Sequence, residues 1–86
     1  MYKLNRDFEI MELENELIAQ NNVNGEIHMI NGTASIILNS LINNRMFIEI
    51  VNMIQDKFPD ANEKELVDDI EETKNILIQK NIIIIE

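Results

Sequence analysis

The spacing of apolar residues changes once along this chain, at Asn31-Gly32-Thr33. Before this point apolar residues tend to occupy every second position, which is typical of a half-buried strand. After it they recur every third or fourth position, which is typical of an amphipathic helix. We therefore expect a strand over residues 26–30 that leads directly into a helix opening near Asn31. The Asn31 side chain is expected to cap this helix by accepting a hydrogen bond from one of its first free N–H groups.

Two further strands are expected before residue 26. They cover residues 8–13 and residues 16–21, and Glu14-Asn15 is expected to turn the chain between them. A second turn, over residues 21–25, contains an Asn-Gly pair, which supplies the positive φ angles that tight hairpins need. The pattern therefore predicts three strands joined as a meander.

The third of these strands is the candidate functional element. Ile27 and Met29 are expected on one of its faces and His28 and Ile30 on the other, because successive strand residues point to opposite sides. A strand edge that lies beside a helix can accept another chain as an extra strand. The strand over residues 26–30 is therefore the first place to look for a binding site.

Helical spacing dominates the rest of the chain. In the first expected helix the apolar residues at 34, 37, 38 and 41 form one stripe, and the helix ends at Asn43-Asn44-Arg45. A second helix is expected over about residues 46–57. A third is expected over residues 63–80, with Asn62 as its N-cap and Asn81 in the left-handed conformation that stops it.

Residues 82–85 are four consecutive isoleucines, which would promote aggregation if they were exposed. We expect them to pack back on the sheet or to extend it. Three strands followed by three helices predict a small α+β domain of the winged helix-turn-helix type, with a three-stranded antiparallel sheet. At 86 residues the chain has room for a single domain over residues 1–86.

Composition excludes several classes of function. Sixteen acidic and seven scattered basic residues give a formal charge of −9, which disfavours binding to nucleic acid. The chain has no cysteine and one histidine, so neither a metal site nor a cofactor is expected. No apolar run is long enough to span a membrane, and the N-terminus lacks a signal-peptide core, so a cytoplasmic location is expected. We find no nucleophile–base pair and no phosphate loop, which argues against an enzyme.

The sequence GEIHMINGTA, residues 25–34, resembles the "G-k-v-y-x-L-N-x-t-a" passage of PqqD-like proteins, also called RiPP recognition elements. A polar break at residues 43–45 follows, and FIEIV at residues 47–51 is similar to the family's "t-v-e-e-I-v". The closing residues 69–83 resemble its "D-v-x-x-f-L-x-x-L-x-x-x-G-L-l". The resemblance spans residues 8 to 83. Asn81 stands where the family usually has Gly, His28 where Tyr or Val is common, and aliphatic residues replace the usual aromatic of the first helix.

This resemblance implies a non-catalytic module of peptide natural-product biosynthesis. Such a module binds the leader segment of a ribosomally made precursor peptide, which adds as a strand to the third strand and lies in a groove beside the third helix. It then delivers the peptide to a modifying enzyme, such as a radical SAM protein, or to a leader peptidase. The chain is expected to be a monomer or a weak homodimer, and quinone-cofactor, lasso-peptide and thioether-peptide pathways all fit.

The candidate peptide-binding residues lie on the third strand and on one flank of the third helix. On the helix, Ile76 is expected to floor a pocket for an apolar leader residue, and Asp69 and Glu72 to pair with leader Lys or Arg. An ordinary structural strand and a solvated acidic helix face remain the plain alternatives. The full set is Glu26, Ile27, His28, Met29, Ile30, Glu65, Asp69, Glu72, Thr73 and Ile76.

Two other functions stay open. A winged-helix regulator that binds DNA would share the architecture, although its recognition helix would need basic residues and the third helix here is acidic. An acyl carrier protein would share the size and charge, and Asn39-Ser40-Leu41 faintly resembles the Asp-Ser-Leu attachment site of that family. In acyl carrier proteins that serine opens a helix, whereas Ser40 is expected near the end of one.

Overall fold

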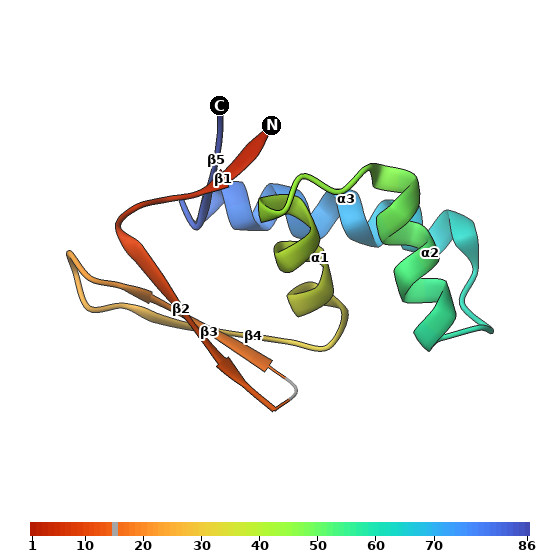
Figure 1. Cartoon of the computed structure of the whole chain (residues 1–86), viewed down its shortest axis with the longest axis horizontal. Coiled ribbons are helices and arrows are strands. Elements are labelled where there is room, and N and C mark those ends of the chain that lie inside the picture. Colours follow the sequence, from red (N-terminus) through yellow and green to blue (C-terminus); the bar gives the residue numbers. More distant parts are fainter. Residues whose placement is uncertain (15) are drawn as a thin grey trace.

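The computed structural model describes residues 1–14 and 16–86, and it contains five strands and three helices within that part of the chain (Figure 1). This confirms the expected succession of a three-stranded antiparallel sheet and three helices, and it adds a short strand at each end. Asn15, half of the turn expected at Glu14-Asn15, lies outside the described residues. The elements are β1 (Tyr2–Leu4), β2 (Phe8–Leu13), β3 (Glu16–Asn21), β4 (Ile27–Asn31), α1 (Thr33–Ile42), α2 (Phe47–Lys57), α3 (Glu63–Gln79) and β5 (Ile83–Ile85).

The sheet order is β2-β3-β4, with both pairings antiparallel, so β4 forms one edge and β2 the other. The turn between β3 and β4 is closed by a 2.8 Å hydrogen bond from the Asn21 N–H to the Glu26 carbonyl. Gly25 has a φ of +78°, whereas Asn24 is not among the residues with positive φ. Only one left-handed residue is needed here because the loop is longer than a two-residue hairpin turn.

The isoleucine tail does not extend this sheet. Ile83–Ile85 pairs antiparallel with Tyr2–Leu4 and forms a separate two-stranded sheet, in which Tyr2 lies opposite Ile85. Three residues are too few to show strand periodicity, so the sequence did not predict β1. This pair is held against α3 by Lys74, whose Nζ lies 2.8 Å from Glu71 and 5.8 Å from the centre of the Tyr2 ring. The hydrogen bond that Lys74 donates to Glu71 raises the pKa of Lys74 above its ordinary value.

The expected cap of the first helix is wrong. α1 begins at Thr33, and its N-cap is Gly32, which has no side chain that could cap the helix. Asn31 is instead the last residue of β4, opposite Glu16. Gly32 makes the corner between strand and helix with a φ of +61°, a conformation that glycine adopts without steric cost. The cap therefore lies one residue later than expected.

The other helix boundaries agree with the sequence. Asn62 caps α3 by accepting hydrogen bonds from the N–H groups of Lys64 (2.8 Å) and Glu65 (3.4 Å). Asn81 follows α3 with a φ of +62°, as expected for a left-handed stop. All three helices turn apolar residues into one core together with the inner face of the sheet. Its buried members include Leu17, Ala19, Ile30, Ile37, Leu38, Ile50, Val51, Ile54, Leu66, Ile70 and Leu77.

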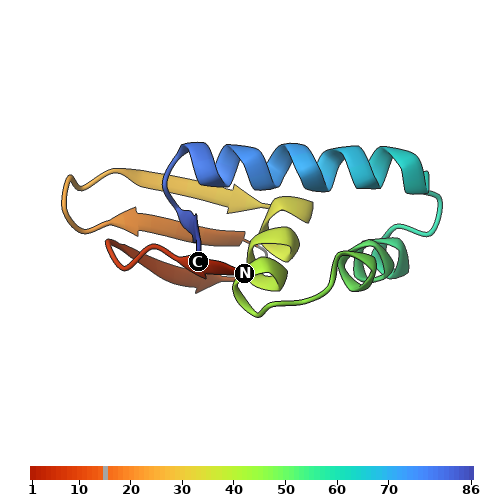
Figure 2. The same ribbon diagram turned by 90° about the horizontal axis from the view of Figure 1, so that it is seen from above.

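The arrangement leaves α3 beside one edge of the sheet. Figure 2 shows α3 running alongside β4, on the side away from β2, while α2 lies beyond the end of the strands. α1 connects the two regions, because it packs against both α3 and β4. Of the helices within residues 1–14 and 16–86, none has the length and apolar character that crossing a membrane requires.

Candidate functional site

Some main-chain hydrogen-bonding groups of β4 point away from the sheet. The bond between Asn21 and Glu26 sets the alternation of the β3–β4 ladder, so His28 and Ile30 exchange hydrogen bonds with β3. The N–H and C=O groups of Ile27 and Met29 consequently point to the other side, away from β3. Within the described part of the chain, these groups have no main-chain partner outside the sheet.

The same edge lacks the residues that usually block strand addition. Natural edge strands are protected by charged side chains, proline, bulges or covering segments. None of the five residues of β4, IHMIN, is Asp, Glu, Lys, Arg or Pro. β4 is therefore an edge that is chemically able to pair with another extended chain.

A hollow of about 180 Å³ lies between β4 and α3. Its centre is apolar, with Ile30 and Leu77 buried and Ile76 42% exposed. The structure thus brings together five of the residues that the sequence singled out, three from β4 and two from α3. One of the three, Met29, belongs to the opposite face of β4 from Ile30 and is 64% exposed, so it lies at the rim of the hollow. The hollow is lined by His28, Met29, Ile30, Ala34, Thr73, Ile76, Leu77, Lys80 and Ile82.

His28 lines this hollow and carries a buried polar atom. Its ring is tilted by 38° against the Phe8 ring, with 6.1 Å between the centroids. Its Nε2 lies 3.5 Å from a carboxylate oxygen of Glu26, which is too long for a good hydrogen bond. Nε2 is buried and has no hydrogen-bond partner among the described residues. An unpaired buried polar atom is costly, so this position carries an unfavourable contribution to stability.

The remaining predicted residues lie outside the hollow. Glu26 and Ile27 belong to the start of the β4 edge, and both are exposed. Glu65, Asp69 and Glu72 are exposed on α3 but do not line the hollow. At a rise of 1.5 Å per residue, Asp69 lies about 6 Å and Glu65 about 12 Å along the helix axis from Thr73. The three carboxylates therefore extend the α3 side of the site in one direction.

Four lining residues were missed by sequence reasoning. Leu77 and Lys80 follow Thr73 and Ile76 at helical spacing, so the periodicity that identified Ile76 could also have found them. Ala34 was assigned to the core stripe of the first helix. Ile82 carries no such signal, because its position depends on how the tail folds back against α3.

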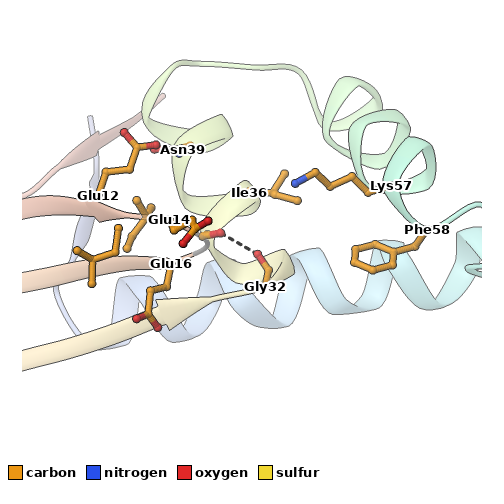
Figure 3. Close-up of a pocket in the computed structure, with 11 residues that line it drawn as sticks. Glu12, Glu14, Glu16, Gly32, Ile36, Asn39, Lys57 and Phe58 are labelled. Atoms are coloured by element: carbon orange, nitrogen blue, oxygen red, sulfur yellow. Dashed lines mark hydrogen bonds between the residues drawn. The ribbon is translucent and has the colours of Figure 1, made fainter.

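A second hollow, of about 370 Å³, lies between the β2–β3 hairpin and the ends of α1 and α2 (Figure 3). Three glutamates line it, Glu12, Glu14 and Glu16, and Lys57 and Phe58 reach it from α2. The Ser35 hydroxyl donates a 2.8 Å hydrogen bond to the Gly32 carbonyl at its wall. It is larger than the hollow beside α3, but four charged side chains share its lining with the apolar residues: Glu12, Glu14, Glu16 and Lys57. Within the described residues, no three potential ligands gather in a way that could hold a metal ion.

Two solved structures have a similar fold. One, described as "TbiB1 in Complex with the TbiA(beta) Leader Peptide", aligns over 94% of this chain and 93% of its own, with 16% identity and a TM-score of 0.81. The other, described as "Lasso peptide synthetase B1 complexed with the leader peptide", aligns over 98% of both chains, with 13% identity and a TM-score of 0.86. No protein-family model matches the chain, and no curated protein matches it significantly in sequence. These likenesses confirm the fold that the PqqD-like resemblance implies, a three-stranded antiparallel sheet followed by three helices.

Proposed function

We propose that this chain binds the leader segment of a ribosomally synthesised precursor peptide and presents it to a modifying enzyme or a leader peptidase, without catalysing a reaction itself. The observation that carries the proposal is the uncharged β4 edge, which lies beside an apolar hollow on α3. The likeness in fold to two proteins whose structures are described as leader-peptide complexes supports it.

The leader would bind as an additional strand on β4. Its main chain exchanges hydrogen bonds with Ile27 and Met29, and these bonds are independent of the leader's sequence. Leader side chains that point inward enter the hollow between β4 and α3, where Ile76 and Leu77 provide apolar contact. Main-chain bonds thus supply affinity and the hollow supplies selectivity.

The acidic flank of α3 would act at longer range. Glu65, Asp69 and Glu72 lie outside the hollow, in solvent, where each ion pair with a leader Lys or Arg contributes only about 0–1 kcal/mol. Their role is to attract a basic leader and raise its rate of association. The same negative charge opposes binding to duplex DNA, whose phosphates require a cationic face.

Strand addition is tested by N-methylating a synthetic leader one residue at a time. The leader is taken from the precursor gene adjacent to the gene for this chain, and affinity is measured by titration calorimetry. We expect a dissociation constant in the micromolar range or below. N-methylation should weaken binding by roughly tenfold or more at residues whose N–H faces β4, and have little effect at the residues between them. A uniform response along the leader would rule out strand addition, and duplex DNA serves as the negative control.

A further inference from the structure

The outer face of the three-stranded sheet carries exposed apolar residues. Met11 lies opposite Ile18, and Ile18 lies opposite Met29, so these three side chains form a row across β2, β3 and β4. Met29 is 64% exposed and Met11 46% exposed, and Ile27, on the same face of β4, is 60% exposed. The other face of the sheet carries the buried residues Leu17, Ala19 and Ile30, which belong to the core shared with the helices. The row ends at the β4 edge, beside the position that an added strand would take.

The two exposed β4 residues are also those whose main-chain groups face the open edge. Ile27 and Met29 alternate with His28 and Ile30, which bond to β3. In any strand that adds to β4, the residues directly opposite Ile27 and Met29 point to the same outer face. Side chains that are directly opposite have Cβ atoms about 4.5–5.5 Å apart, so they pack against each other.

We infer that the outer face of β4 is a second specificity surface, which selects a peptide with large apolar side chains at two positions, i and i+2, opposite Ile27 and Met29. This inference rests on the proposed strand addition and names the class of peptide that fits. The residue between these two positions points inward, toward His28 and the hollow. The recognised segment is therefore apolar–variable–apolar on the outer face, in addition to whatever the hollow accepts.

Of the two positions, the one opposite Met29 has the stronger preference for apolar over polar residues. Met29 continues into the apolar row through Ile18, whereas the neighbour of Ile27 on β3 is Gln20. An apolar peptide residue beside Met29 would thus extend a row of three apolar side chains to four. The flexible thioether chain of methionine adapts to different shapes, so several large apolar residues are accepted there.

The test is a selection of random short peptides on the immobilised full chain, repeated with Met29→Glu. With the natural residue, we expect enriched peptides to carry large apolar residues at two positions separated by one. With Met29→Glu, the enriched residue at one of these positions should change to Lys or Arg, because a carboxylate now lies opposite it. Met29→Leu should preserve the apolar preference. Val23→Glu, a change at a 75% exposed residue of the β3–β4 turn, is the matched control and should leave the selected pattern unchanged.

A double-mutant cycle sharpens this test with one selected peptide. Replacing its Met29-facing residue by Ser should weaken binding to the natural chain by roughly fivefold, and binding to Met29→Ser by less than about twofold. An apolar preference confined to inward positions, or no change with Met29→Glu, would overturn the inference while leaving strand addition intact. Failure of both the selected peptides and the synthetic leader to bind would overturn strand addition, and the inference with it. Thermal unfolding of each variant confirms that it is folded.

Discussion

The two edges of the three-stranded sheet, β2 and β4, differ in how they meet solvent. β2 carries the exposed carboxylates Glu9 and Glu12, and the Phe8 N–H is already bonded to the Asn5 carbonyl at 2.9 Å. β4 has no Asp, Glu, Lys or Arg, and it borders an apolar hollow instead. Because charge on an edge strand opposes unwanted pairing, the β2 edge has a protection that the β4 edge lacks.

The largest effect is expected from proline at equivalent places on the two edges. Met29→Pro removes an N–H that faces away from β3, so the hydrogen bonds between β3 and β4 are retained. A bound peptide, however, loses the Met29 N–H as a donor to one of its carbonyl groups. We expect leader affinity to fall by roughly tenfold or more, measured by calorimetry. Glu12→Pro removes the corresponding outward N–H from β2 and should leave affinity unchanged. Equal losses in both variants would show that the effect comes from a disturbed sheet rather than from the β4 edge.

A charge placed in the hollow should have the next largest effect. Ile76→Glu replaces an apolar side chain between β4 and α3 by a carboxylate that an apolar leader residue cannot contact without desolvating it. The cost is about 1–2 kcal/mol, so binding should weaken by roughly fivefold to thirtyfold. Ile48→Glu, at a 50% exposed residue of α2, is the matched control and should bind the leader normally. If both variants bind as tightly as the natural chain, the leader does not enter this hollow.

Neutralising the acidic flank of α3 should have a smaller effect that depends on salt. Asp69→Asn combined with Glu72→Gln removes two exposed carboxylates, and we expect about a two- to fivefold loss of affinity for a basic leader at low ionic strength. The loss should disappear near 0.5 M salt, because screening then acts within a few ångströms. Stopped-flow measurements should locate the change in the association rate. A loss that persists at high salt would indicate direct, partly buried contact instead.

Removing the protection of β2 should change self-association rather than peptide binding. Glu9→Val combined with Glu12→Val leaves an uncharged edge on each side of the sheet. Sedimentation velocity should then show more association with increasing protein concentration than in the natural chain, while leader affinity stays within about twofold. Glu63→Gln combined with Glu65→Gln, which removes the same charge from the first turn of α3, separates the effect of the edge from that of net charge. If both pairs of substitutions increase association equally, the carboxylates of β2 have no special role.

Local sequence patterns determined most of the elements of this protein. Alternation identified the strand that contains Ile27 to Ile30, and helical spacing identified Ile76 as an apolar residue on an acidic flank. Asn62 and Asn81 marked the ends of α3 correctly, because capping depends on a few neighbouring residues. These signals lie within one or two helical turns, or within one strand, so a single chain suffices to read them.

Tertiary structure decided which residues that are far apart in the sequence come into contact. The pairing of Tyr2 with Ile85, and the place of Ile82 in the wall of the hollow, arise when the chain ends meet, and no local pattern encodes that meeting. The strand-to-helix corner also followed the three-dimensional path, because Gly32 turned the chain where Asn31 was expected to cap it. The phase of the ladder, which frees the main chain of Ile27 and Met29, depends on pairing with β3. The sequence alone thus identified the strand and the helix of the candidate site. Folding determined which of their groups face the open edge of the sheet and the hollow beside it.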